Sequence, residues 1–412
     1  MRFNTSLLHG KAIQKNPQGE ILPPVSQVTA FCYESMEELE KVFQHKRMGY
    51  AYTRIGNPGI AAFEQRVCEL EGGAGAVATS SGMSAVALAI LNVCGSGDEI
   101  VVGSGLYGGT IDLFHDLEKL GIKVHFAKDM EASSIEPLLN EHTRLIFGEL
   151  ISNPAQRVMD VPVLSELAHA HGIPLIVDST TATPVIARPL LLGADIVIHS
   201  TSKYINGGGN AIGGIIVDGG KFPWDFEKHS ALAEFRKYGK MAFLLRLRTD
   251  LWENLGCCMA PANAFLNSIG ADTLGLRMQR ICENADALAK ALDGIEDIEV
   301  NYLGLPQHPC HAYVEKELNG LGGGILNFRT GSKERAFRII NSLKYALIAS
   351  NIGDLRTLVI HPASTLYIRV PREEQEAAGV YEDTVRVSVG IEDKEDLIED
   401  FIQAIERSRE EQ

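Results

Sequence analysis

The stretch that decides the fold is "IVIHSTSKYINGGGNAIGGIIVDGG", residues 196–220. It opens with a β-branched run typical of a buried strand, places Lys203 among small hydroxyl residues, and continues through glycines into a second apolar run. A lysine directly after a buried strand is unusual, because lysine normally lies on the solvated surface. In α/β sheets ligands bind beyond the carboxyl ends of the strands, so the stretch predicts a ligand site around Lys203.

Outward from this stretch, strands and helices alternate. Short Val/Ile-rich runs separated by amphipathic patterns fill residues 61–245, which is typical of a mostly parallel sheet covered by helices on both faces. Before them, weak periodicity and turn signals predict an extended arm, 1–60, with one short helix within 35–46. After them, long helices and fewer strands predict a smaller α+β domain over 246–412.

Polar, aromatic or glycine residues follow four of the predicted strands, at the edge where ligands are expected. They are Gly82 and Met83 before an apolar helix, Tyr107 in a glycine loop, Asp178, and Ser200, Ser202 and Lys203. Backbone N–H groups at a helix N-terminus favour a phosphate, so the first pair predicts a phosphate seat.

These groups match the needs of pyridoxal phosphate. That cofactor needs a lysine for a Schiff base, a carboxylate facing its pyridine nitrogen, a phosphate cradle and an aromatic face. Taken singly, Lys203 would be interpreted as a surface residue and Asp178 as a turn cap. Their joint placement at strand ends favours the cofactor.

A competing fingerprint lies earlier in the chain. Gly103, Gly105 and Gly108 form G-x-G-x-x-G after the strand "DEIVV", and Asp129 ends the next strand. An NAD-dependent oxidoreductase is therefore an alternative, although Tyr107 would bring a bulky ring close to the pyrophosphate. A second alternative is a non-catalytic binding or structural protein with the same fold. Bound pyridoxal phosphate would give a yellow protein bleached by borohydride.

Composition argues against several other functions. The net charge of −15 and the lack of a Lys/Arg-rich block argue against a nucleic-acid partner. No segment offers the roughly 20 apolar residues of a membrane span, and the N-terminus lacks a signal-peptide pattern, so we expect a cytoplasmic protein. The seven cysteines lack CxxC spacing and fit reduced thiols. His308, Cys310 and His311 have no second ligand pair, so we expect no metal.

Longer motifs carry a resemblance that covers nearly the whole chain. They are "AYTRIGNP", "LEGGAGAVATSSGMSA", "LYGGT", "SNPAQRVMD", "VDSTTATPVIARPLLLGADIVIHSTSKYINGGG", "NIGDLRTLVIHPAST" and "VRVSVGIED". Together they resemble the Cys/Met metabolism pyridoxal-phosphate family of trans-sulfuration enzymes, with a pattern closest to the O-acetylhomoserine sulfhydrylases. The resemblance implies the type I fold of pyridoxal-phosphate transferases and small amino-acid substrates.

The resemblance also implies a role for each site residue. Lys203 would form the Schiff base and then shuttle protons, Asp178 would pair with the pyridinium, and Tyr107 would stack on the ring and act in catalysis. The remaining cofactor contacts would come from Asn153 on the ring hydroxyl, from Gly82, Met83, Ser200 and Ser202 on the phosphate, and from Tyr52 and Arg54 of a neighbouring subunit. The substrate would be bound by Arg386 at its carboxylate, with Asn351 and Tyr52 nearby. Shared sites imply a homodimer or homotetramer.

Within this family the pattern favours γ-replacement on an O-acylated homoserine by sulfide or a small thiol. Gly109 stands where methionine γ-lyases typically have a cysteine, and Asn351 stands where several other branches have serine. Two features keep γ-elimination, as in methionine or cystathionine γ-lyases, as the alternative. Met83 is more common in lyases and cystathionine synthases, and Leu366 and Tyr367 replace the usual Thr and His after "HPAST".

Overall fold

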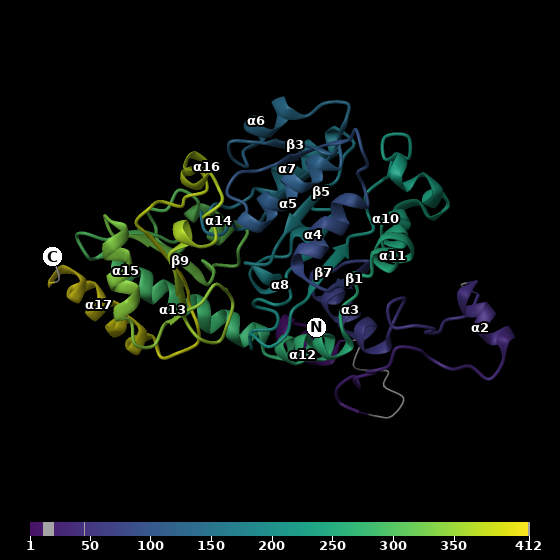
Figure 1. The fold of residues 1–412 in the computed structure, drawn as a ribbon, viewed down its shortest axis with the longest axis horizontal. Helices are drawn as coiled ribbons and strands as arrows, with labels where there is room; N and C mark the ends of the chain where they lie inside the picture. The colour runs from purple at the N-terminus through teal and green to yellow at the C-terminus, as the bar shows by residue number, and fades with distance from the viewer. Residues whose placement is uncertain (11–19, 45, 411–412) are drawn as a thin grey trace.

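A seven-stranded sheet forms the centre of the protein (Figure 1). The computed structural model describes residues 1–10, 20–44 and 46–410. The strand order is β1-β7-β6-β5-β4-β2-β3. The strands are β1 (Gly75–Thr79), β2 (Glu99–Val102), β3 (Lys123–Phe126), β4 (Thr143–Glu149), β5 (Leu175–Asp178), β6 (Ile196–His199) and β7 (Gly214–Asp218). Strands β3, β2, β4, β5 and β6 are parallel and β7 is antiparallel to both neighbours, so the predicted mostly parallel sheet is confirmed.

Helices cover both faces of this sheet, because alternate residues of each strand enter two different apolar clusters. In β5, Leu175 and Val177 pack into one cluster and Ile176 into the other. The first cluster includes α3 (Pro58–Glu71), α7 (Val161–Ala170), α8 (Thr183–Ile186), α9 (Pro189–Leu192), α12 (Pro261–Asp272) and α13 (Leu274–Asp293). The second includes α4 (Gly82–Leu91), α5 (Gly108–Lys119) and α10 (Ala242–Arg246). Short helices α6 (Ala132–Ile135) and α11 (Glu253–Leu255) lie in connections.

The start of α4 is specified by its own sequence. Ser81 caps the helix by accepting a hydrogen bond from the backbone N–H of Ser84, and the Ser84 hydroxyl accepts one from the Ser81 N–H in return. Such a capping box fixes where the helix begins and contributes about 1 kcal/mol. It therefore sets Gly82 and Met83 as the first helical residues, as the sequence predicted, where N–H groups have no intrahelical partner.

A second sheet, of five strands, lies toward the C-terminus (Figure 1). Its order is β10-β11-β12-β9-β8. The strands are β8 (Glu299–Asn301), β9 (Ile325–Arg329), β10 (Leu347–Ile348), β11 (Leu358–Ile360) and β12 (Thr384–Ser388), and the helices are α14 (His311–Lys316), α15 (Lys333–Ser342), α16 (Arg372–Ala377) and α17 (Lys394–Glu410). The predicted smaller α+β part is confirmed.

Helix α13 joins the two bodies. Met278 and Ile281 belong to the core of the first sheet, whereas Leu288 and Leu292 belong to the core of the second. The predicted division at residues 245/246 stays a prediction. Helix α12, which follows that point, packs against α3 of the first body.

The N-terminal segment contains one helix that the sequence reasoning missed. Helix α1 (Phe3–His9) buries Leu7, whose carbonyl accepts a hydrogen bond from Arg66 of α3. A helix this short has weak periodicity and is stabilised by tertiary contacts rather than by propensity. The helix predicted within 35–46 is present as α2 (Met36–Phe43), and it projects away from the second sheet (Figure 1). Residues 11–19 of the predicted arm and His45 of the predicted helix range lie outside the described residues.

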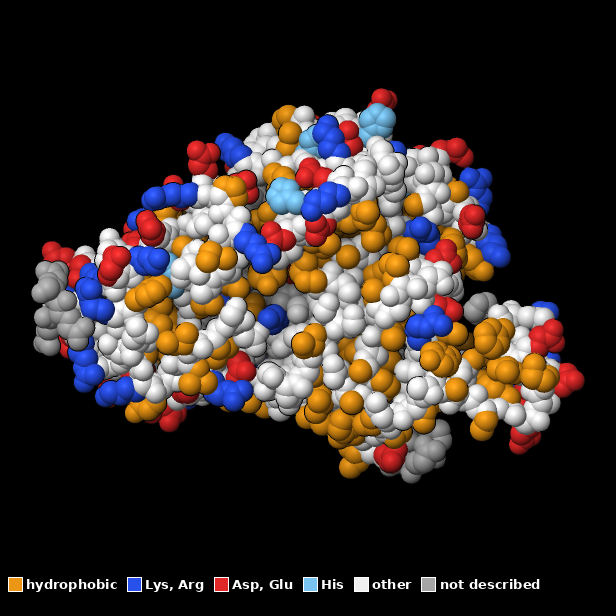
Figure 2. Space-filling model, viewed as in Figure 1, with side chains coloured by type: hydrophobic (Ala, Val, Ile, Leu, Met, Phe, Trp, Pro, Cys, Tyr) orange, Lys and Arg blue, Asp and Glu red, His pale blue; other side chains and the backbone are white. Residues whose placement is uncertain are grey.

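Acidic and basic side chains are interspersed on the face shown in Figure 2, and apolar side chains gather over the projecting arm. Exposed apolar residues of the arm include Val28, Met36, Phe43 and Met48. In the part of the chain that the structure describes, no helix is both long enough and apolar enough to cross a bilayer.

Candidate active site

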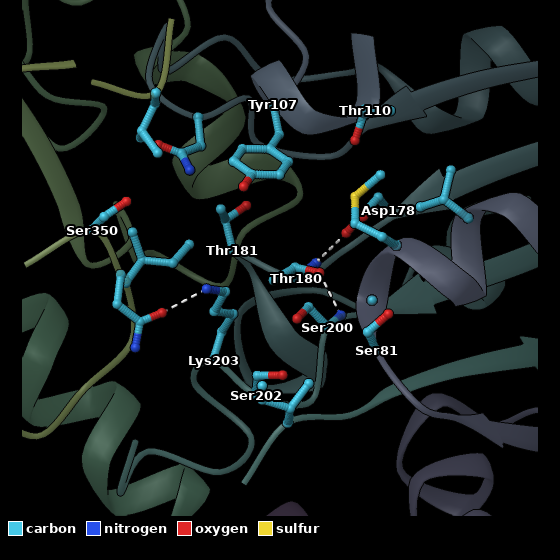
Figure 3. Close-up of a pocket in the computed structure, with 18 of the residues that line it drawn as sticks. Ser81, Tyr107, Thr110, Asp178, Thr180, Thr181, Ser200, Ser202, Lys203 and Ser350 are labelled. Carbon is cyan, nitrogen blue, oxygen red and sulfur yellow. Dashed lines mark hydrogen bonds between the residues drawn. The ribbon is translucent and has the colours of Figure 1, made fainter. Parts of the chain in front are cut away.

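A pocket of about 550 Å³ lies beyond the carboxyl ends of the parallel strands (Figure 3). Ten predicted site residues line it: Gly82, Met83, Tyr107, Asn153, Asp178, Ser200, Ser202, Lys203, Asn351 and Arg386. Seven of them were expected here from their places at strand ends, whereas Asn153, Asn351 and Arg386 were implied by the family resemblance. Tyr52 and Arg54 are not among the lining residues.

Lys203 lies in the turn after β6, and its amine points into the pocket (Figure 3). Its Nζ donates to Asn351 Oδ1 at 2.5 Å. Burial, with a smaller contribution from the charge of Arg386, lowers the pKa of Lys203 to about 8. The turn is held from below by the buried Arg277, whose guanidinium donates to the carbonyls of Tyr204 at 2.7 Å and Ile205 at 3.2 Å. The amine is therefore fixed in place, and a larger fraction of it is neutral at physiological pH than for an ordinary lysine.

Asp178 ends β5, the parallel neighbour of β6, and approaches the pocket from another side than Lys203 (Figure 3). Its Oδ1 accepts a hydrogen bond from the Thr180 N–H at 2.9 Å, so Asp178 does cap the following turn while it also lines the pocket. Burial raises the pKa of Asp178, and the hydrogen bonds from Thr180 offset part of that rise. A buried carboxylate of this kind is stabilised by a cationic partner.

The start of α4 forms a cradle that only glycine fits. A Cβ built on Gly82 would lie 2.6 Å from Ser200 Cβ, so backbone and Ser200 meet without a side chain between them. Ser200 and Ser202 lie beyond the last residue of β6, so the segment after the strand places them and not the strand itself. The Ser202 hydroxyl instead exchanges hydrogen bonds with Gly213, donating to its carbonyl at 3.1 Å and accepting from its N–H at 2.9 Å.

Arg386 of β12 reaches the pocket from the second sheet and is 3% exposed. Its guanidinium donates to Asn153 Oδ1 at 3.3 Å and to the Asn351 carbonyl at 3.0 Å. Its Nε has no hydrogen-bond partner among the described residues. Burial lowers the pKa of Arg386 to about 10, so it stays charged at neutral pH. A buried guanidinium with an unused donor is suited to bind a carboxylate.

Glu149 is a pocket residue that the sequence reasoning missed. It ends β4 beside Asp178 on β5, and its carboxylate accepts from the Tyr107 N–H at 2.6 Å and the Asn153 N–H at 3.2 Å. Burial, and then repulsion from Asp178, raises the pKa of Glu149 to about 8. A signal was present, because Glu149 follows the run "LIFG" as Asp178 follows "PLIV".

Tyr52 and Arg54 lie together on the arm. The Arg54 guanidinium carbon is 5.6 Å from the centre of the Tyr52 ring, and its Nη1 donates to the Glu253 carbonyl at 2.8 Å. Neither residue lines the pocket of its own chain.

The glycines of the competing fingerprint pack against the chain itself. A Cβ on Gly103 would overlap Met130, and one on Gly108 would lie 3.0 Å from the Leu366 carbonyl. This packing leaves the loop little room for a pyrophosphate and disfavours the dinucleotide interpretation. Among the described residues no group of three or more His, Cys, Asp or Glu side chains is placed to hold a metal.

The pocket fits pyridoxal phosphate in each of its parts: an amine, a buried carboxylate, an aromatic ring, a helix N-terminus with a side-chain-free approach, and a guanidinium with an unused donor. Fold and pocket together define a pyridoxal-phosphate-dependent enzyme of the type I fold. The sequence profile of the Cys/Met metabolism PLP-dependent enzyme family matches residues 4–406, and the chain belongs to that family.

Known relatives include both transferases and lyases. O-acetyl-L-homoserine sulfhydrylase of Corynebacterium glutamicum is 39% identical over 97% of this chain and 95% of its own length. L-methionine gamma-lyase of Fusobacterium nucleatum is 36% identical over 98% of each chain. The crystal structure of a putative O-acetylhomoserine (thiol)-lyase of Campylobacter jejuni, which contains N'-pyridoxyl-lysine-5'-monophosphate, superposes with a TM-score of 0.94 at 33% identity, covering 98% of this chain and 100% of that one.

Proposed function

We propose that this protein catalyses γ-replacement on an O-acylated homoserine, with sulfide or a small thiol as the nucleophile. The O-acetylhomoserine sulfhydrylase among its relatives supports this reaction. The observation that carries the choice is at Gly109, where a Cβ would lie 2.7 Å from Cε1 of the Tyr107 ring. The cysteine typical of methionine γ-lyases at this position would displace that ring.

Each pocket residue then has a task. Bound pyridoxal phosphate supplies an electron sink that acidifies the substrate Cα. Lys203 holds the cofactor and then moves protons at the substrate carbons, which its lowered pKa permits. Asp178 keeps the ring nitrogen protonated, and Tyr107 packs on the ring and assists departure of the γ-substituent. Arg386 binds the substrate carboxylate.

The other predicted contacts surround these groups. Gly82 and Met83 present helix N–H groups to the phosphate, joined by Ser200 and Ser202. Asn153 orients the ring hydroxyl.

A substrate screen tests the proposal. Purified protein loaded with cofactor would be assayed with O-acetylhomoserine plus sulfide, and separately with methionine, homocysteine or cystathionine alone. We expect homocysteine from the first mixture as the dominant product. Sulfide-independent release of an oxo acid as the main activity would overturn the assignment.

γ-Elimination is the second candidate, and two observations favour it. One relative is a methionine gamma-lyase. Met83, Leu366 and Ile352 also give the pocket apolar lining that suits a thioether side chain.

We also propose that two copies of the chain share active sites, with Tyr52 and Arg54 of one copy completing the pocket of the other in a dimer or tetramer. The apolar side chains that the arm exposes support such contact (Figure 2). We also propose a cytoplasmic location, which the cysteine usage supports because seven cysteines without CxxC spacing fit reduced thiols.

Arg386→Lys should raise KM for the amino-acid substrate by about 10- to 100-fold, because an ammonium cannot reproduce a two-point guanidinium contact. Steady-state kinetics would check this, with Arg280→Lys as the control because Arg280 lies partly exposed on α13, outside the pocket. An unchanged KM in the Arg386 variant would show that the carboxylate binds elsewhere.

Attachment of the cofactor to cofactor-free protein should speed up with pH through about pH 8. Only the neutral amine of Lys203 is nucleophilic, and a pKa lowered to about 8 means that its fraction rises across this range rather than near the usual 10.5. Stopped-flow absorbance at several pH values would measure the rate. A rate that keeps rising to pH 10 would contradict the lowered pKa.

A further inference from the structure

Two loops that carry cofactor-contacting residues are held by the same pair of buried side chains. One loop bears Tyr107 and the other bears Asn153. The pair consists of Glu149, at the end of β4, and Tyr367, in the segment between β11 and α16. We call Glu149 and Tyr367 the loop clamp.

In each loop, the loop clamp holds one backbone N–H group and one backbone carbonyl group. Glu149 accepts from the Tyr107 N–H at 2.6 Å and from the Asn153 N–H at 3.2 Å. The Tyr367 hydroxyl approaches the Leu106 carbonyl at 3.0 Å and the Asn153 carbonyl at 3.3 Å. The Leu106 carbonyl and the Tyr107 N–H belong to one peptide group, so that group is held at both ends.

The chemistry of the two side chains is complementary. Glu149 offers two acceptor oxygens to two N–H donors, whereas Tyr367 offers one proton to two carbonyl acceptors. The Tyr367 ring is fully buried, and its segment packs directly on the start of α5, where the Leu366 carbonyl would lie 3.0 Å from a Cβ at Gly108. Because the Tyr367 side chain is fully buried, a carbonyl that loses its hydrogen bond to the hydroxyl is left as a buried unpaired acceptor, which is costly.

We propose that Glu149 and Tyr367 are positioning residues that set the tilt of the cofactor ring through the Tyr107 and Asn153 loops. The inference rests on the proposed roles of Tyr107 and Asn153 in holding the cofactor. It links the segment after "HPAST", where this chain departs from the usual family pattern, to the reacting ring.

The test compares Tyr367→Phe and Glu149→Gln with wild type as cofactor-loaded enzymes. Visible circular dichroism of the bound cofactor reports the ring's orientation, and steady-state kinetics with O-acetylhomoserine and sulfide report function. We expect Tyr367→Phe to weaken the dichroic band and to lower kcat by about three- to tenfold, with KM changed by less than about twofold. Glu149→Gln should do more, because an amide nitrogen cannot accept from an N–H.

Tyr302→Phe is the matched control. Tyr302 is 1% exposed and its hydroxyl also donates to a backbone carbonyl, that of Gly323, at 3.1 Å, but it does not line the pocket. We expect it to lower the thermal midpoint as Tyr367→Phe does, with the dichroic band and kcat unchanged. The double variant Glu149→Gln/Tyr367→Phe should lose less than the sum of the two single losses, because both side chains hold the same peptide group.

An unchanged dichroic band and an unchanged kcat in Tyr367→Phe would overturn the inference, as would equal losses in Tyr302→Phe. The dichroic band needs no substrate, so it tests the loop clamp even if the enzyme prefers another reaction. The proposed function is tested separately, by the substrate that wild type turns over.

Discussion

Lys203→Ala should abolish covalent attachment of the cofactor and lower kcat/KM by about 10³-fold or more. The substitution removes both the attachment point and the group that moves protons at the substrate carbons, and a positioned acid–base group alone contributes about 10²- to 10⁴-fold. Lys203 and Arg386 are the only cationic side chains among the described residues that line the pocket, so no other lysine of the pocket could attach the cofactor in place of Lys203.

Borohydride reduction followed by peptide mapping measures attachment directly. The pyridoxyl group should appear on the peptide that contains Lys203 in wild type and on no peptide of the variant. Lys221→Ala is the control, since Lys221 is an exposed lysine outside the pocket and should keep both label and activity. A pyridoxyl label on the Lys203→Ala protein would contradict the assignment.

Much of this site could be predicted from the sequence, because the sequence shows where buried strands end. Apolar runs such as "PLIV" and "IVIH" predict buried parallel strands, and their carboxyl ends converge at one edge of the sheet. Asp178 and Lys203 could therefore be placed together from position alone. Glu149 obeys the same rule, but the sequence reasoning did not single it out.

Other features could not be read from local patterns. Tyr367 donates a hydrogen bond to the Leu106 carbonyl, 261 positions away in the chain, and no sequence spacing signals such a contact. Helix α1 is too short to show a clear period and depends on tertiary contacts with α3. The proposed role of Tyr52 and Arg54 involves a second copy of the chain, which one sequence cannot position.

Asp178→Asn, at the opposite end of the cofactor from Lys203, should lower kcat/KM by about 10²-fold or more while leaving the fold intact. Asparagine keeps an oxygen that can accept from the Thr180 N–H, as Oδ1 does now at 2.9 Å, but it cannot hold a proton on the ring nitrogen. Since burial already raises the pKa of Asp178, removing the charge should not lower the thermal midpoint of cofactor-free protein.

Two comparisons make this prediction specific to the ring nitrogen. A cofactor analogue methylated on that nitrogen carries a fixed positive charge, so it should restore part of the activity of Asp178→Asn. Asp218→Asn is the matched control, because Asp218 is also buried, also accepts from a backbone N–H, that of Gly220 at 2.8 Å, and lies outside the pocket. Its activity should equal that of wild type. If Asp178→Asn gains nothing from the methylated analogue, or if Asp218→Asn is equally impaired, the lost activity reflects a disturbed strand end and Asp178 does not serve the ring.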